Sequence, residues 1–426
     1  MRGKVFLFLA LLGLAGCATN PVTGKVELDL LGEEQELLLG AQLAPALIQD
    51  ALGPIDDPRL NKLVEEVGLK VAQVSHRPRL PYVFTPVNDP AVNAFALPGG
   101  KICITRGLLA RLDSEDGLAA VLGHEVAHVT ARHAVAAYNR QVLTSLFLAS
   151  SAAVLEAKEV RGRELIWVGG LVAAQAILAK YSRDQERQSD ALGLQYAVAA
   201  GYSPWGMVET QKVLLSLHRQ QPTLVERLFA SHPHSSERLL ATQRLVEQLP
   251  ADVVARTPRK EPFLEVTAPL RQVQPAWEAA TEGRQLVQQG QPAKALHPLV
   301  RAKELAPQEG VIRTWLAVAL WDTDQRGAAR EEALVAVTLA PRVFFSRLVA
   351  AIFSLDRDPT MSLTQLEEAE RLLSGTALVP FLQGRAHEQL HQRAQAVEAY
   401  REALRRDPQG EVGQAAAARL RALENL

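Results

Sequence analysis

The feature that constrains the fold most is a repeat of about 34 residues in the last third of the chain. Alanines recur at separations of 34, 33 and 34 residues, at Ala302, Ala336, Ala369 and Ala403. A proline follows the first, second and fourth of these alanines by five residues. Small residues at a fixed interval mark positions where paired helices cross, and proline marks the end of a unit. The pattern therefore predicts a stack of helix pairs from residue 276 onward.

A period of 34 residues is typical of tetratricopeptide repeats. Gly283 and Gly384 stand at the matching early position of their units. We therefore expect an all-α tetratricopeptide-repeat solenoid over residues 276–426, whose concave surface binds polypeptide partners. The alternative is an alanine-rich helical bundle with accidental spacing, which four in-phase alanines make weak.

The rest of the chain divides into three segments. Residues 1–16 are expected as a signal peptide, 17–250 as a folded domain, and 251–275, which hold several prolines, as a linker or extended strap. Short apolar runs at 82–85 and 101–105 predict strands, and the acidic, serine-containing start at Asp113 predicts a helix to about Asn139. The domain is therefore predicted to be mostly helical with a small sheet, which is an α+β class.

The N-terminus predicts export and lipidation. Arg2 and Lys4 precede an uncharged run, 5–16, that is shorter than the ~20 residues of a spanning helix. The run ends in Leu-Ala-Gly-Cys, which resembles a bacterial lipobox and would place lipid on Cys17. Ala18 in place of aspartate then implies anchoring to the outer membrane of a Gram-negative bacterium, on its periplasmic side. The alternative is an ordinary signal that happens to contain a cysteine.

Composition narrows the possible partners. A formal net charge of −1 and an aromatic content of 5% give no basic or stacking surface for nucleic acid, so none is expected as a partner. Lipidation would leave Cys103 as the one remaining cysteine, which predicts a small buried apolar residue and no disulfide within the chain.

A metal motif lies in the predicted helix that begins near Asp113. His124 and His128 are four residues apart, so both imidazoles can face one ion, while Glu125 can reach the ion's water. A catalytic zinc site needs a third protein ligand, for which Glu186 is the best candidate. Asp190, one turn later, could accept a hydrogen bond from a liganding histidine. One Zn²⁺ per chain and a zinc peptidase mechanism with Glu125 as the base follow.

A second HExxH occurs at 387–391, inside the last predicted repeat. His387 occupies a position that usually carries an aromatic packing residue, and no glutamate followed four residues later by aspartate comes after it. We interpret this copy as a partly exposed helix face. The motif alone is therefore moderate evidence for a metal site.

Five motifs together resemble a known family. They lie at 20–24, 93–100, 124–128, 186–190 and 231–234 leading to Arg238. Residues 18 to about 245 resemble the HtpX-like and CAAX-prenyl-protease-like gluzincins, and the lipobox and repeats favour the periplasmic BepA-like subgroup. The resemblance implies a zincin-like metallopeptidase domain with zinc on His124, His128 and Glu186. It also implies an edge strand that pairs with the substrate backbone, at Asn93, Ala94, Phe95 and Ala96.

The resemblance further implies a role for His232 near the metal, either in stabilising the oxyanion or in occupying the water position at rest. His133 and His234 are expected to lie outside the site, because His133 is rotated away from the metal-binding helix face. Two uncharged stretches, 142–155 and 165–179, are too short to span a bilayer and are expected as helices roofing the active site.

Three functional hypotheses follow. The leading one is an envelope endopeptidase for misfolded or stalled outer-membrane and periplasmic proteins, whose repeats dock substrates or the outer-membrane assembly machinery. The second is a chaperone or adaptor for which proteolysis is secondary. The third, a structural lipoprotein scaffold, leaves the metal ligands unexplained.

Overall fold

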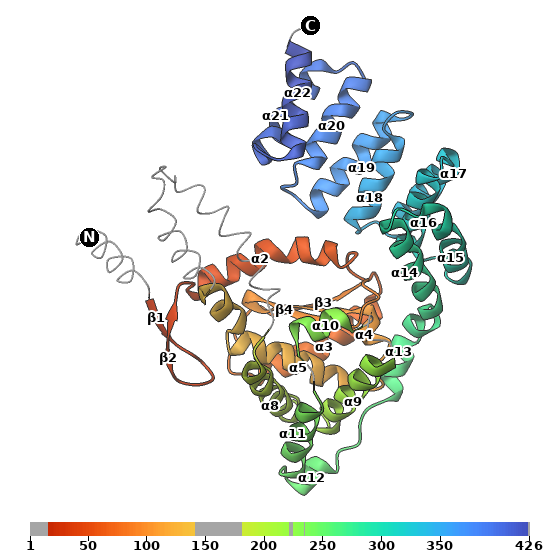
Figure 1. Ribbon diagram of the computed structural model, residues 1–426. Coiled ribbons are helices and arrows are strands. Elements are labelled where there is room, and N and C mark those ends of the chain that lie inside the picture. Colours follow the sequence, from red (N-terminus) through yellow and green to blue (C-terminus); the bar gives the residue numbers. More distant parts are fainter. Residues whose placement is uncertain (1–15, 141–180, 221–224, 234, 425–426) are drawn as a thin grey trace, which may run out of the picture. The chain divides into compact units, whose positions relative to one another are not determined.

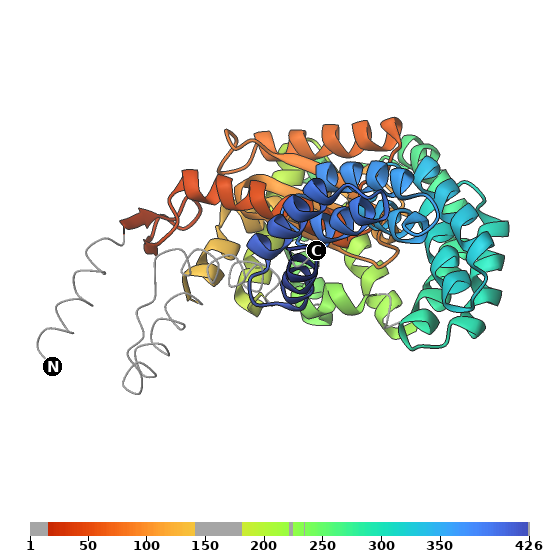
Figure 2. The same ribbon diagram turned by 90° about the horizontal axis from the view of Figure 1, so that it is seen from above.

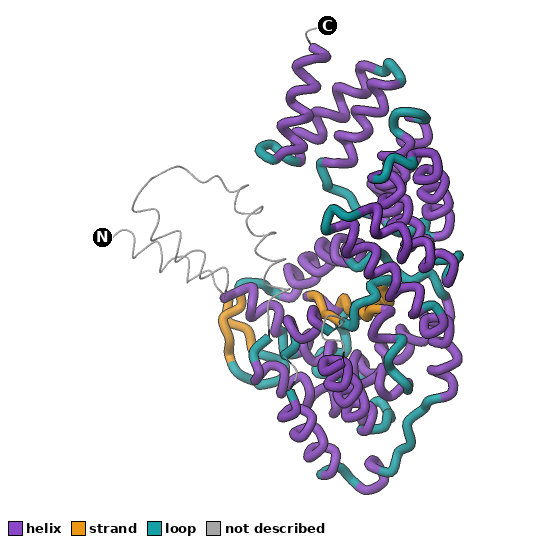
Figure 3. The backbone as a smooth tube through the Cα atoms, turned by 45° about the vertical axis from the view of Figure 1, so that its right-hand side comes forward, coloured by secondary structure: helices purple, strands orange, loops and turns teal. Residues whose placement is uncertain are grey.

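The computed structural model describes residues 16–140, 181–220, 225–233 and 235–424, which form two compact units. The first comprises Met1–Ala44, Asp57–Pro86 and Ala91–Ala268, and the second comprises Pro45–Asp56, Val87–Pro90 and Pro269–Leu426. Helices dominate both, and strands form two small groups (Figure 3). The signal expected over 1–15 and the uncharged stretches at 142–155 and 165–179 lie outside the described residues. Within the described ranges, no helix is both long and apolar enough to cross a membrane.

The first unit contains both sheets. β1 (Gly16–Thr19) and β2 (Val26–Asp29) form an antiparallel hairpin. β3 (Val83–Val87), β4 (Ala94–Leu97) and β5 (Lys101–Thr105) form a second sheet in the order β3-β5-β4. The short helix η1 (Pro98–Gly100) connects β4 to its antiparallel partner β5. β4 therefore lies at an edge of this sheet.

Helices surround the larger sheet, with α2 along one side and α5 along the other (Figure 1). In chain order these helices are α2 (Glu33–Asp50), α3 (Pro58–Gln73), α4 (Arg106–Leu109), α5 (Glu115–Thr130), α8 (Arg183–Ala199), α9 (Trp205–Gln220), α10 (Glu226–Ser231) and α11 (Ser236–Glu247). Cys103, on β5, is buried and free, as the cysteine count predicts. The prediction of a mostly helical α+β domain is confirmed.

The helix expected to run to Asn139 is interrupted. α5 ends at Thr130, Arg132 adopts a positive φ of 56°, and the chain is helical again over 133–140. The Arg132 guanidinium donates to Asp29 at 2.8 and 3.2 Å and to Glu36 at 3.1 Å. These partners lie about a hundred residues earlier in the chain. The ion pairs therefore stabilise a backbone conformation that local sequence disfavours.

A second contact joins the β1–β2 hairpin to the same place. Asn20 is 6% exposed, and its Nδ2 donates to the carbonyl oxygen of Ala131 at 3.2 Å. That carbonyl belongs to the end of α5, where helix carbonyls lack partners within the helix. The hairpin is thus fixed to the C-terminal end of α5 through Asn20 and Arg132.

The proline-containing segment 251–275 differs from the linker that its composition indicates. It contains α12 (Ala251–Val254) and α13 (Glu261–Gln272). Pro250 caps α12 and Pro262 lies in the first turn of α13, where a missing backbone N–H costs nothing. Phe263 on α13 is fully buried. Tertiary packing therefore overrides the proline signal here.

The second unit is a series of antiparallel helix pairs that stack side by side (Figure 2). Its helices are α14 (Gln274–Gln288), α15 (Pro292–Leu305), α16 (Gly310–Asp322), α17 (Arg326–Leu339), α18 (Phe344–Ser354), α19 (Pro359–Leu372), α20 (Leu378–Gln389), α21 (Arg393–Arg406) and α22 (Glu411–Glu424). The four in-phase alanines have no exposed surface. A Cβ on Gly384 would lie 2.6 Å from the Tyr400 ring, which explains the small residue there. The all-α repeat solenoid is confirmed.

Candidate metal centre and active site

α5 carries the first part of the site. Ser114 caps the helix by accepting from the Gly117 amide at 3.0 Å, and every residue from Asp116 to Thr130 is buried. His124 and His128 lie one turn apart, and their Nε2 atoms are 3.0 Å from each other. Two imidazole nitrogens thus point at one location inside the domain.

α8 brings a carboxylate to the same location. Oε1 of Glu186 lies 3.3 Å from Nε2 of His128, and its Oε2 lies 3.6 Å from Nε2 of His124. Ser182 and Gln185 form a reciprocal capping box that fixes the start of α8 at Arg183, three residues before Glu186. The spacing in sequence from the histidines, about sixty residues, carries no information on this contact. The contact arises because α5 and α8 pack closely against each other.

Two glycines permit that packing. A Cβ on Gly123 would lie 2.8 Å from the carbonyl oxygen of Gly193, and a Cβ on Gly193 would lie 2.7 Å from the amide nitrogen of His124. Both distances are shorter than side chains tolerate, so α5 and α8 reach this separation only because neither position carries a side chain. The glycine pair therefore sets the distance between Glu186 and the histidines.

His232 completes the cluster from the residue that follows α10. Its Nδ1 lies 3.0 Å from Oε1 of Glu186, and its Nε2 lies 3.8 Å from Oε1 of Glu125. One ligand atom from each of His124, His128, Glu186 and His232 lies within 4.8 Å of the others. All four residues are buried. The loop histidine therefore lies inside the cluster, beside the carboxylate of Glu125.

The donor set suits a metal ion. Neutral imidazole nitrogens and a carboxylate oxygen are the ligands of catalytic zinc sites that leave a position open to water. Without a cation, one of the two Nε2 atoms would have to carry a proton, because two lone pairs 3.0 Å apart repel each other. Oε2 of Glu125 is buried and has no hydrogen-bond partner among the described residues, as expected of a base whose partner is water or substrate. The cluster can therefore hold a metal ion.

Residues 58–246 match the family model described as Peptidase family M48. This region is similar to M48 peptidases and is called the M48 domain below. The Beta-barrel assembly-enhancing protease of Escherichia coli (strain K12) is 26% identical over 252 residues, which cover 58% of this chain and 48% of that protein. The mitochondrial metalloendopeptidase OMA1 of Schizosaccharomyces pombe is 32% identical over 195 residues, which cover 45% of this chain and 54% of that protein. The chain thus spans about half the length of the curated relatives it matches.

The resemblance described from the sequence is confirmed for the M48 domain. Among solved structures, the tetratricopeptide-repeat protein YrrB is 15% identical, with 49% of this chain and 99% of that chain covered and a TM-score of 0.32. The repeat fold rests instead on the helix pairs and on the burial of the in-phase alanines.

The charges of the M48 domain's cluster are strongly coupled. Burial raises the pKa of the Glu125 carboxyl, and His232 and His124 offset this only in part. Burial alone would also raise the pKa of Glu186, but the imidazoles around it bring that pKa well below its usual range. Burial lowers the pKa of His128. The cluster therefore favours neutral His128 beside an ionised Glu186.

Asp190 and Arg238 contact two of the candidate ligands. Oδ1 of Asp190 lies 3.1 Å from Nδ1 of His124, on the ring side opposite the cluster. Arg238, on α11, donates to both oxygens of Asp190 at 2.7 Å and to Oε2 of Glu186 at 2.5 Å. Burial would raise the pKa of Asp190, but Arg238 and His124 lower it. The role of Arg238 could not be predicted from its motif, because its partners Glu186 and Asp190 lie on another helix.

His133 lies where the sequence analysis did not place it. The interruption of the helix at Arg132 returns this residue to the site, and its Nδ1 lies 3.0 Å from Nδ1 of His128. It is 4% exposed, and burial lowers its pKa to about 4. The expectation that helical rotation carries His133 away is therefore wrong, because α5 ends before it. His234 lies outside the described residues.

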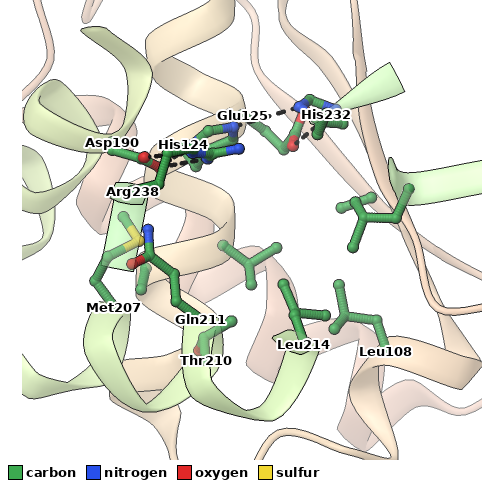
Figure 4. Close-up of a pocket in the computed structure, with 14 residues that line it drawn as sticks. Leu108, His124, Glu125, Asp190, Met207, Thr210, Gln211, Leu214, His232 and Arg238 are labelled. Atoms are coloured by element: carbon green, nitrogen blue, oxygen red, sulfur yellow. Dashed lines mark hydrogen bonds and ion pairs between the residues drawn. The ribbon is translucent and has the colours of Figure 1, made fainter. Parts of the chain in front are cut away.

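A mostly apolar cleft of about 490 Å³ opens beside Glu125 and His232 (Figure 4). Its apolar wall comes from four elements, through Leu108, Val121, Met207, Leu214 and Leu228. Ala94 of β4 also lines it. The cleft can accommodate an apolar side chain next to Glu125.

The backbone N–H and C=O groups of successive residues in β4 point alternately to the two edges of the strand. The carbonyl oxygen of Asn93 accepts from the amide of Thr105 at 3.0 Å, and Phe95 is paired with Cys103, so both face β5. Alternation in an antiparallel pair then directs the backbone groups of Ala94 and Ala96 outward. The Ala96 amide accordingly lies against Glu125, where it helps to counter the rise in that residue's pKa. The outward side of β4 therefore faces the carboxylate of Glu125.

The second HExxH has a different environment. Nδ1 of His387 lies 2.7 Å from Oε1 of Gln392, and Glu388 accepts from the Tyr400 hydroxyl at 2.5 Å. His391 lies beyond the end of α20 with a φ of 60°, so it is not on one helix face with His387. In the described part of the chain this segment belongs to no cluster of potential metal ligands.

Proposed function

We propose that the chain is a zinc-dependent endopeptidase of the bacterial envelope. The observation that carries this proposal is the convergence of His124, His128 and Glu186 in a buried cluster. Beside it lies the Glu125 carboxylate, one oxygen of which has no partner among the described residues. The match of residues 58–246 to an M48 peptidase model supports the same chemistry.

The three ligands would hold the zinc ion, with His232 close enough to approach it. Bound zinc supplies Lewis acidity, which lowers the pKa of water and polarises a peptide carbonyl. Glu125 takes a proton from the attacking water and delivers it to the leaving amine. Its buried position raises its pKa toward values that suit both steps. His232 is placed to donate to the oxygen on which negative charge develops.

The substrate backbone is proposed to add to β4. The outward N–H and C=O groups of Ala94 and Ala96 would pair with an extended peptide, which would place it along Glu125 and the apolar cleft. Ala94→Pro removes one outward N–H while leaving the ladder to β5 intact, so we expect a raised KM and a folded protein. Phe95→Pro is the control, because it removes an inward N–H and is expected to destabilise the sheet instead. An unchanged KM in the first variant would exclude pairing at Ala94.

The site of action and the clients are proposed from the sequence. A lipid on Cys17 would anchor the chain to the inner leaflet of the outer membrane, and misfolded or stalled outer-membrane and periplasmic proteins would be the substrates. The repeats would dock these clients or the assembly machinery. The name of the Escherichia coli relative, an assembly-enhancing protease, supports this role.

The decisive experiment is Glu125→Gln, with Glu388→Gln in the second HExxH as the matched control. Loss of general base catalysis is expected to lower the cleavage rate about 10²–10⁴-fold while zinc content stays the same. The control is expected to cleave at the normal rate. Normal cleavage of an unfolded polypeptide by Glu125→Gln would disprove the mechanism. Loss of cleavage with full rescue of an outer-membrane assembly defect in cells would instead favour a chaperone or adaptor.

A further inference from the structure

The outward-facing nitrogens of the two histidines on α5 have different kinds of partner. Nδ1 of His124 faces the carboxylate of Asp190, whereas Nδ1 of His128 faces Nδ1 of His133 at 3.0 Å. Nε2 of His133 in turn lies 3.0 Å from Oε1 of Gln188. His128, His133 and Gln188 therefore form a continuous hydrogen-bonded chain that leads away from the metal cluster.

The hydrogen bonds in this series of side chains all run in one direction, from donor to acceptor. A neutral imidazole has one donor and one acceptor nitrogen, and the amide oxygen of Gln188 can only accept. His133 therefore carries its proton on Nε2 and accepts at Nδ1. The proton between the two rings must then belong to Nδ1 of His128. This leaves the lone pair of His128 on Nε2, the nitrogen that faces Glu186 at 3.3 Å.

The opposite direction would prevent metal binding. If the amide nitrogen of Gln188 faced His133, it would donate to Nε2 of His133, and Nδ1 of His133 would then donate to Nδ1 of His128. His128 would then hold a proton on Nε2 and offer no lone pair to the cluster. The orientation of a half-buried amide thus decides whether His128 can act as a ligand.

The backbone places His133 for this contact. Arg132 adopts its positive φ because Asp29 and Glu36 bind its guanidinium, and the next residue consequently turns back toward α8. The Tyr181 ring lies against His128, with 3.9 Å between the ring centroids, and both histidines are buried. Ser189 is a competing donor to Nδ1 of His133, but its Oγ lies farther away, at 3.5 Å.

We propose that His133 is a positioning residue which, together with Gln188, fixes the tautomer of His128 so that Nε2 is available to the metal. The inference rests on the zinc site proposed above. It assigns His133 no contact with the substrate or the metal. Outer partners of liganding histidines typically contribute 10–100-fold to metal affinity.

The test measures the zinc dissociation constant of the full chain by chelator competition, together with the unfolding temperature of the zinc-free protein. His133→Phe removes the acceptor and is expected to weaken zinc binding 10–100-fold. His133→Gln supplies an amide oxygen at the same place and is expected to restore most of the affinity. Equal affinities in these two variants would overturn the proposal, since packing alone would then explain the result.

Gln188 gives an independent test in case His133→Phe does not fold. Gln188→Glu keeps an acceptor and is expected to bind zinc at least as tightly as the wild type, whereas Gln188→Met is expected to bind it more weakly. Ser189→Ala is the matched control and is expected to change nothing. Equal zinc affinity in the two Gln188 variants would contradict the proposal.

The zinc site itself is tested separately with His128→Ala. Retention of zinc by that variant would refute the proposed function, whatever the His133 variants show. Loss of zinc in His128→Ala together with normal affinity in His133→Phe would overturn the present inference alone.

Discussion

The chain contains the same five-residue pattern twice, on α5 and on α20, and the two copies have different surroundings. Around His124 and His128, three other elements contribute Glu186, His232 and Arg238, and the whole cluster is buried. Around His387 the pattern lies at the end of a repeat helix, and its glutamate binds Tyr400. A helical spacing of four residues permits a metal site, but residues from distant parts of the chain create it.

The most direct test of this difference is to remove one histidine from each copy and compare zinc binding. His128→Ala is expected to abolish stoichiometric zinc binding and cleavage, because a catalytic site needs three protein ligands. His391→Ala is expected to leave both unchanged. Metal analysis of the purified proteins measures the difference. Loss of zinc in the second variant would mean that the C-terminal copy binds metal after all.

The next largest effect is expected from two arginines, one that binds the carboxylates next to the first copy and one that contacts the glutamate of the second copy. Arg238→Met leaves Glu186 and Asp190 as buried carboxylates without their cation, so we expect a loss of about 3–5 kcal/mol in the free energy of unfolding. Arg419, which lies 3.2 Å from Glu388, is 44% exposed, and Arg419→Met is expected to cost less than about 1 kcal/mol. Urea denaturation of the zinc-free proteins compares them, and equal losses would contradict the assigned difference in burial.

Helix packing gives a smaller effect. Gly193→Ala forces a methyl group to 2.7 Å from the amide nitrogen of His124, so α8 must move away from α5. We expect a loss of about 1–3 kcal/mol in stability and a weaker zinc affinity. Gly327→Ala on α17 has open space around it and is the control, with stability unchanged or slightly raised. Zinc affinity equal to wild type in Gly193→Ala would show that the helix separation does not set the ligand geometry.

The smallest effect concerns the C-terminal copy alone. Tyr400→Phe removes the hydroxyl that donates to Glu388, and we expect a loss of about 1 kcal/mol in the stability of the repeats. Cleavage by the M48 domain is expected to stay at the wild-type rate. Parallel thermal unfolding and peptidase assays check both statements. A change in cleavage rate would reveal a link between the two copies.

Structural features that depend on the spacing of nearby residues could be predicted from the sequence. The repeat period gave the helix pairs, because the in-phase alanines occupy buried crossings. Residues one turn apart, such as His124 with His128 and Glu186 with Asp190, could be placed on one helix face in the same way. The choice of Glu186 as a ligand remains a prediction, although the structure brings it to the histidines.

Contacts between distant segments could not be predicted. The turn at Arg132 depends on Asp29 and Glu36, and without these partners a continuous helix was the reasonable expectation. His133 was misplaced for that reason. Likewise, the prolines of 251–275 indicated a linker, but burial of Phe263 stabilises a helix there. In both places the deciding energy comes from tertiary contacts that local sequence does not encode.

With the proposed lipid on Cys17, the hydrogen bond from Asn20 to the end of α5 would limit the distance between that helix and the membrane. Only three peptide units separate Cys17 from Asn20, a contour length of about 10 Å when fully extended. α5 would then have no long tether and would remain close to the bilayer instead of reaching across the periplasm. It would act within a thin layer beside the bilayer, and only clients that arrive at that surface would be cut.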